Sequence, residues 1–248
     1  MKDFYLGIKF SFSYFSTLPA QMNQNSDLLK KEILNIMLLF LPMVGYVLGL
    51  GTILVFSFFS HLEWFGALIS AVVYMLFYGF IHTKAIINIF DAIYAKNLGK
   101  DVYKVIKEPT VGAIGVLYGV SFLLLKVAAI TMLFTHNLLT EFLAIVIISR
   151  LSLLSLIVLH DFNSLFLTQL KESLDLWFLM MLFIVATIMG SFLISCFTLL
   201  LLVGLISGFL ISIMLAKKLG FANGDVLSAT LEGVELTLFI FIIFFRMN

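Results

Sequence analysis

Cysteine, proline and charged residues are scarce in this chain of 248 residues. The single cysteine, Cys196, lies inside an apolar run, which excludes a framework of disulfides within the chain. Only 12% of the residues are charged, 62% are hydrophobic, and the mean hydropathy is +1.15. The formal net charge of +1 gives no basis for a nucleic-acid partner, and none is expected. So little charge beside so much apolar surface predicts an integral membrane protein.

The apolar residues form long continuous runs rather than the alternating pattern of a membrane barrel, which predicts an all-α fold. A helix needs about 20 apolar residues to cross the bilayer core. Seven segments qualify as transmembrane helices: 33–59, 63–81, 111–135, 139–160, 174–191, 193–215 and 229–245. A tight turn near Gly190 is expected between the fifth and the sixth. Three prolines in all favour uninterrupted helices, and the lack of repeats or linkers predicts one membrane domain over residues 1–248.

Apart from Lys126, which lies inside the third segment, the lysines occupy alternate connections between these segments. They precede the first segment and lie between the second and third, the fourth and fifth, and the sixth and seventh. The connections around positions 61, 136 and 190 carry neither lysine nor arginine. Because basic connections remain on the cytoplasmic side, the pattern predicts a cytoplasmic N-terminus and one cytoplasmic face for all the polar connections. Arg246, near the C-terminus, is the one exception to this pattern, because the predicted topology places it outside the cytoplasm.

The longest polar interruption, residues 82–115, contains Lys84, Asn88 and Asp91 at spacing i, i+4, i+7. On a helix these three side chains share one face, from which they can reach one metal ion or phosphate. The alternative is a solvated helix whose lysines contact lipid headgroups.

The same interruption ends on the segment K-E-P-T-V-G at 107–112, which enters the third span. Its proline suits a helix start, and Gly112 and Gly115 permit close backbone approach. A helix N-terminus at the membrane surface is a natural anion site. An ordinary span start with small residues for helix packing is the alternative.

Charged residues also lie inside predicted spans. Glu232 and Glu235 lie in the seventh span, after Asp225. Burying unpaired carboxylates in lipid is expensive, so they should face the protein interior or an aqueous cavity. Asp225 itself can act as a helix cap instead. Arg150 in the fourth span can pair with Glu232 or Glu235, and Lys126 in the third also needs an acid; a substrate contact is the alternative for both.

These residues belong to a wider pattern: over nearly its full length, the chain resembles the cobalamin synthase family, adenosylcobinamide-GDP ribazoletransferase. Five elements in order carry the resemblance: F-S-T-L-P at 15–19, F-L-P-M-V-G-Y-V-L-G at 40–49, K-E-P-T-V-G-A-I-G at 107–115, S-R at 149–150 and G-D-V-L-S-A at 224–229. The glutamates at 232 and 235 fall on acids that follow the last element.

The family's acidic motif, H-x-D-G-x-x-D-x-x-D-G, is altered in this chain. His82 and Asp91 match it, while Lys84 and Asn88 replace its first two acids. The chain has Ala85 and Ala92 at the two glycine positions, and Glu108 and Thr110 for an Asp and an Arg of the later element. Two of three clustered carboxylates are therefore absent, one of them replaced by a cation.

The resemblance implies a transferase in the bacterial or archaeal cytoplasmic (inner) membrane. It would join α-ribazole, or its 5′-phosphate, to adenosylcobinamide-GDP and release GMP, with Mg²⁺ as cofactor. The implied catalytic and metal-binding residues are Asp91, Asp225 and Glu108. The implied substrate-binding residues are His82, Lys84, Asn88, Lys107, Arg150, Glu232 and Glu235.

Two other functions stay open on the sequence. The replaced acids would suit a catalytically silent relative that binds a corrinoid, although such a protein has no physical need for two acids within a span. A small-molecule transporter predicts broken helices and mid-membrane charges in two similar halves, and the sequence shows no such halves. A homo-oligomer also stays open.

Overall fold

The computed structural model describes residues 2–18, 28–107 and 110–247. Within these ranges every regular element is a helix, which confirms the all-α prediction. Six helical spans in this part of the chain are long and apolar enough to cross a membrane, and a bent pair can supply a seventh. The first is Lys31–Leu62, which consists of α2 (Lys31–Leu39), α3 (Leu41–Phe59) and the short 3₁₀ helix η1 (Ser60–Leu62). The others are Ala113–Thr135 (α7), Leu139–Leu159 (α8), Leu176–Leu193 (α10), Phe197–Leu219 (α11) and Gly224–Arg246, which belongs to α12 (Gly224–Met247).

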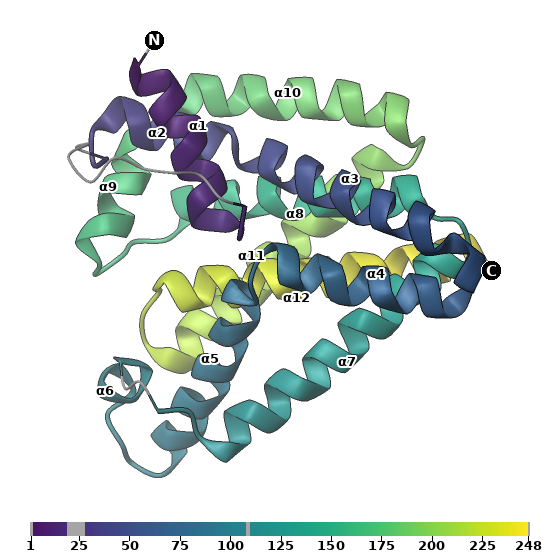
Figure 1. Cartoon of the computed structure of the whole chain (residues 1–248). Coiled ribbons are helices and arrows are strands. Elements are labelled where there is room, and N and C mark those ends of the chain that lie inside the picture. The colour runs from purple at the N-terminus through teal and green to yellow at the C-terminus, as the bar shows by residue number, and fades with distance from the viewer. Residues whose placement is uncertain (1, 19–27, 108–109, 248) are drawn as a thin grey trace.

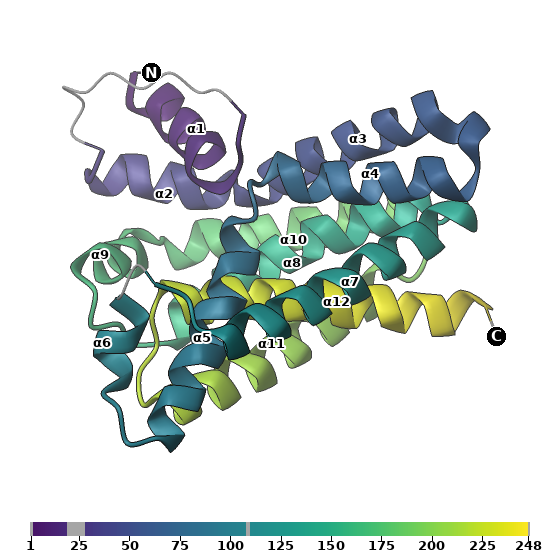
Figure 2. The same ribbon diagram turned by 60° about the horizontal axis from the view of Figure 1, so that its bottom comes forward.

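The bent pair consists of α4 (Trp64–Phe77) and α5 (Ile81–Asn97), whose axes differ by 78°. Gly79 and Phe80 between them both have positive φ, at 63° and 54°, and this left-handed pair turns the chain. With 14 residues, α4 is only about 21 Å long. The segment predicted at 63–81 therefore ends early, and the first part of the polar stretch after it forms the packed helix α5 (Figures 1 and 2).

Two details inside the predicted spans differ from the structure. The predicted first span is present as Lys31–Leu62, but a break at Phe40 separates α2 from α3, because Pro42 occupies the first turn of α3 and suits a helix start. The turn expected near Gly190 lies instead at residues 194–196. Gly190 stays inside α10, where the ring of Phe197 packs so close that an added Cβ would meet it at 2.3 Å.

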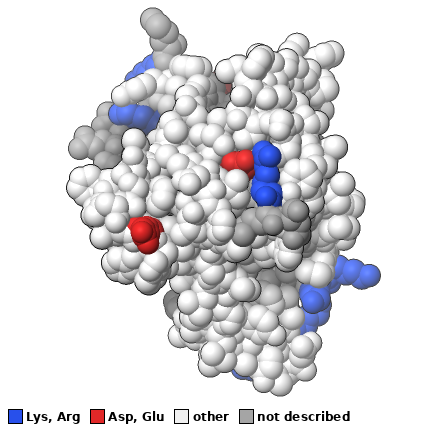
Figure 3. All heavy atoms as spheres, turned by 90° about the vertical axis from the view of Figure 1, so that its right-hand side faces the viewer, with Lys and Arg blue, Asp and Glu red and all other residues white. Residues whose placement is uncertain are grey.

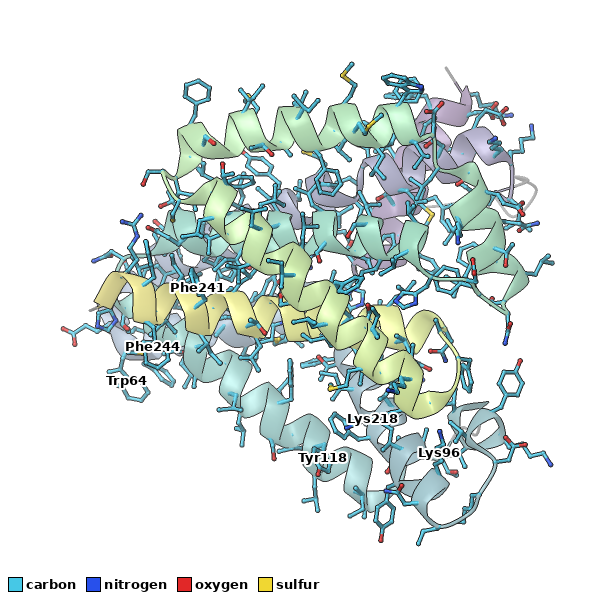
Figure 4. All side chains as sticks on the ribbon, turned by 180° about the vertical axis from the view of Figure 1, so that it is seen from behind. Trp64, Lys96, Tyr118, Lys218, Phe241 and Phe244 are labelled. Carbon is cyan, nitrogen blue, oxygen red and sulfur yellow. The ribbon has the colours of Figure 1, made fainter. Side chains whose placement is uncertain are left out.

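The helices run between two ends of different chemistry. One end gathers the N-terminal α1 (Lys2–Phe15), α2, α5, α6 (Val102–Lys107) and α9 (Leu165–Ser173), and the C-terminus lies at the other (Figure 1). Figure 3 faces the C-terminal end, which exposes few charged side chains. Lys96 and Lys218 lie at the first end, and Trp64 and Phe244 at the second (Figure 4). The lysine-rich connections therefore share one end, as the sequence predicted; which side of the membrane this end faces stays a prediction.

The core is built around α8, whose apolar stretch is 78% buried inside the protein. It packs against α3, α11 and α12. By contrast, the apolar stretch of α10 is only 11% buried, and this helix lies at the edge of the bundle (Figure 1). A smaller apolar cluster joins α5 to the ends of α11 and α12, through Ile86, Ile89, Leu215, Leu219 and Val226. This cluster fixes the polar face of α5 beside the start of α12.

Candidate functional site

A cavity of about 460 Å³ lies where α5 meets the first turn of α12, and we call it the α5–α12 pocket. His82, Lys84 and Asn88 of α5 and Asp225 of α12 line it. Apolar side chains of α1, α8 and α9 complete its wall. The pocket thus brings three predicted site residues of α5 together with a fourth, Asp225, which lies 137 positions beyond Asn88 in the chain.

The start of α12 is fixed by a cap. The chain leaves α11 through Gly220, whose φ of 96° favours glycine. The Asn223 Oδ1 then accepts a hydrogen bond from the backbone N–H of Val226 at 2.9 Å, so Asn223 caps the helix. An isolated parallel bridge between Phe162 and Ala222 ties this turn to the loop after α8. Asp225 is therefore left free to face the pocket.

Asp225 has few partners of its own. Its carboxylate accepts long hydrogen bonds from the side-chain amides of Asn88 at 3.3 Å and Asn223 at 3.4 Å. The Lys84 ammonium is exposed, and its charge also acts on this carboxylate. Asn88 and Lys84 share a face of α5 as the i, i+4 spacing predicted. The polar residues that line the pocket are therefore Asp225, Lys84 and Asn88, together with His82, Ser228 and Tyr14.

His82 is buried at the wall of the pocket and is 4% exposed. Its ring lies 6.4 Å from the ring of Phe15 and 5.6 Å from that of Tyr78, measured between centroids. Phe15 begins the first family-like element, so that element covers the histidine. No described residue hydrogen-bonds the His82 Nδ1, which leaves a buried polar atom for a ligand to satisfy.

Asp91 lies elsewhere on α5 and faces α7. Its two carboxylate oxygens accept hydrogen bonds from the backbone N–H groups of Gly112 at 2.5 Å and Gly115 at 2.6 Å. At Gly115 an added Cβ would lie 2.4 Å from the Ile87 carbonyl oxygen, which explains the glycine there. The start of α7 therefore binds the Asp91 carboxylate, and the binding of a substrate anion there stays a prediction. The catalytic and metal-binding roles of Asp91 also stay predictions.

Replacing Asp91 with alanine should destabilise the protein. The carboxylate satisfies two amide donors at a helix N-terminus, and losing such a cap costs about 1–2 kcal/mol of unfolding free energy. Unfolding in mixed detergent micelles would measure the loss. Asp91→Asn, which keeps one oxygen acceptor, should lose less; an alanine variant as stable as wild type would contradict the capping role.

Four charged side chains form a buried network deeper in the bundle. The Lys126 Nζ of α7 lies 2.6 Å from a carboxylate oxygen of Glu232 and 2.6 Å from one of Glu235. Arg150 of α8 is paired with the other oxygen of Glu235. Two cations and two anions cancel, and all four side chains are at most 3% exposed. Arg150 thus forms an ion pair with Glu235, one of its two predicted partners, and Lys126 forms ion pairs with both Glu232 and Glu235.

Hydroxyl groups complete this network. The hydroxyls of Tyr74 at 2.8 Å and Ser149 at 3.0 Å donate to Glu235, and Thr83 donates to Glu232 at 3.5 Å. The sequence did not predict a role for Tyr74, Thr83 or Ser149 in such a network. A spacing of i, i+4 between Tyr74 and Tyr78 in an apolar helix was the one available signal.

The remaining predicted residues are not brought into the pocket. Arg150, Glu232 and Glu235 belong to the buried network and do not line the α5–α12 pocket. Glu108 lies outside the described residues, as does the side chain of Lys107. Asp161, beyond the end of α8, is fully exposed, and its hydrogen bond from Lys171 lowers the pKa of its carboxyl below the usual value.

Comparison with known proteins agrees with the resemblance. Residues 7–243 match the family model described as cobalamin-5-phosphate synthase. Adenosylcobinamide-GDP ribazoletransferases of Clostridium perfringens strains SM101 and 13 are each 28% identical over 249 residues, which cover 96% of this chain and 97% of theirs. The enzyme of that name from Methanosarcina mazei is 30% identical over 128 residues, covering 50% of this chain and 44% of its own. No solved structure matches. The chain belongs to the cobalamin-5-phosphate synthase family.

Proposed function

We propose that this protein is an adenosylcobinamide-GDP ribazoletransferase and that the α5–α12 pocket is its active site. One observation carries the proposal: the family-like positions His82, Lys84, Asn88 and Asp225, from two distant parts of the chain, line one cavity at the polar end of the bundle. The relatives that match over nearly their full length carry this activity in their names.

The reaction transfers a phosphoryl group between two oxygens. A ribose hydroxyl that is free both in α-ribazole and in its 5′-phosphate attacks, and its oxygen forms a bond to the phosphorus nearer the cobinamide. The bond from that phosphorus to the bridging oxygen breaks, and GMP leaves with this oxygen. The attacking hydroxyl loses its proton to a base, and Asp225 is the carboxylate that the pocket offers for this. The cavity of about 460 Å³ suits the reacting diphosphate, while the larger corrinoid ring stays at its mouth.

The pocket residues suit an anionic substrate. Lys84 supplies a positive charge, and the N-terminus of α12 adds the positive end of a long helix dipole. The free Nδ1 of His82 and the amide of Asn88 offer hydrogen bonds. Arg150, Glu232 and Glu235 act indirectly in this proposal, by holding α8 and α12 together behind the pocket. A diphosphate contact of Lys107 and a catalytic role of Glu108 stay predictions.

Magnesium, which the resemblance implies, fits the described donors poorly. A protein-held Mg²⁺ needs several oxygen ligands in near-octahedral geometry. No three His, Cys, Asp or Glu side chains in residues 2–18, 28–107 and 110–247 gather as a metal site. Asp91 gives its oxygens to backbone amides, and Lys84 places an ammonium beside Asp225. The described residues therefore do not form a magnesium site by themselves.

Product analysis tests the proposed reaction. The purified protein in lipid nanodiscs would receive adenosylcobinamide-GDP and α-ribazole, in separate buffers with Mg²⁺ and with EDTA. We expect GMP and the cobalamin product in equal amounts, and no GMP when α-ribazole is omitted. The absence of both products in both buffers would overturn the transferase proposal. It would favour the silent corrinoid-binding relative, which the replacements at Lys84 and Asn88 also suit.

A further inference from the structure

The acidic motif differs from that of the family where it meets the α5–α12 pocket. Of its three acid positions, Lys84 and Asn88 line the pocket without a carboxylate, and Asp91 faces α7. Asp225 is the one acid among the described lining residues. A divalent cation would thus find one carboxylate there and an ammonium beside it, which repels it.

The Lys84 side chain is placed to act as the pocket's own cation. It is exposed, lines the cavity, and forms no hydrogen bond or ion pair with any described side chain. Its charge acts on Asp225, which the two amides hold only at 3.3 and 3.4 Å. A phosphate oxygen of the substrate can therefore bind the Lys84 ammonium without breaking a strong contact.

Two further features of the pocket favour an anion. The first turn of α12 opens toward space at Gly224, where an added Cβ would meet nothing within 4 Å, so a ligand can approach the helix N-terminus. The His82 Nδ1, on a side chain that is 4% exposed, has no partner among the described residues. A buried nitrogen of this kind requires a donor or acceptor from the ligand.

We propose that the Lys84 ammonium, with the N-terminus of α12, holds the diphosphate of the substrate in place of a protein-bound divalent cation. The inference rests on the proposed function, since it concerns how that substrate is anchored. It follows that the protein binds adenosylcobinamide-GDP in the complete absence of divalent ions. It also follows that an aspartate at position 84 would make binding depend on them.

Equilibrium binding tests this directly. Isothermal titration of the protein in nanodiscs with adenosylcobinamide-GDP would be run in EDTA and in Mg²⁺. We expect the wild-type Kd in EDTA to lie within about threefold of that in Mg²⁺. Lys84→Ala should weaken binding in EDTA by about 10- to 100-fold, because it removes a charge-assisted hydrogen bond. Lys84→Arg should retain binding, and Lys84→Asp should bind only in Mg²⁺.

The control is Lys100→Ala, which removes another exposed lysine after α5 that does not line the pocket. It should bind as wild type does, and because Lys84 and Lys100 are both exposed, all variants should keep the wild-type melting temperature. Wild-type binding that appears only with Mg²⁺, or a Lys84→Ala variant that binds normally in EDTA, would overturn this inference alone. Wild-type binding in neither buffer would overturn the proposed substrate as well.

Discussion

Replacing Glu235 with alanine is expected to lower the free energy of unfolding by about 3–5 kcal/mol. This carboxylate pairs with both Lys126 and Arg150, and Tyr74 and Ser149 donate to it. Its loss leaves two buried cations with only Glu232 to balance them. Unfolding by increasing SDS in mixed micelles, followed by circular dichroism, would give the free energy.

Two controls separate burial from pairing. Glu141→Ala breaks the ion pair between Glu141 and Arg246, whose charged atoms lie 3.1 Å apart. Because the Arg246 side chain is 36% exposed, this variant should lower the free energy of unfolding by only about 0–1 kcal/mol. The double variant Lys126→Met, Glu232→Gln removes one charge of each sign and leaves Arg150 and Glu235 paired. It should be more stable than Lys126→Met alone. A Glu235→Ala variant no less stable than Glu141→Ala would show that the network contributes little.

Replacing Asp225 with asparagine should reduce kcat for cobalamin formation by about 10²- to 10⁴-fold, the usual contribution of a general base. The shape of the side chain is preserved, and Asn223 rather than Asp225 caps α12. Stability should therefore change little. Steady-state release of GMP, with the melting temperature recorded on the same sample, would measure both quantities.

The matched control for Asp225 is Asp161→Asn, at an exposed carboxylate that pairs with Lys171 outside the pocket. It should keep the wild-type kcat. An Asp225→Asn variant with normal kcat would show that Asp225 is not the general base. Glu108, which lies outside the described residues, would then be the next candidate.

The spans were predictable because each apolar run is long enough to satisfy its own backbone in lipid. Their interruptions were less so. The bend between α4 and α5 depends on positive φ at Gly79 and Phe80, and nothing marks a phenylalanine for that conformation. Gly190 looked like a turn, but its missing side chain serves the close approach of Phe197. Packing between helices decided these places, and local sequence does not record it.

The site shows the same limit. The face of α5 that carries Lys84 and Asn88 followed from helical spacing, and the resemblance supplied Asp225. The use of Asp91 as a cap for α7 was not predicted, although Gly112 and Gly115 were singled out. A carboxylate on a motif helix can serve a metal or a helix N-terminus equally well by residue type. Only the position of the neighbouring helix distinguishes the two.

The position of the bound substrate tests the account most directly. A structure of the protein in lipid with adenosylcobinamide-GDP, prepared in EDTA, would locate the diphosphate. We predict phosphate oxygens within hydrogen-bond distance of the Lys84 ammonium and the first turn of α12, with Asp91 still bound to Gly112 and Gly115. A diphosphate held beside Asp91, away from Lys84 and Asp225, would contradict the account.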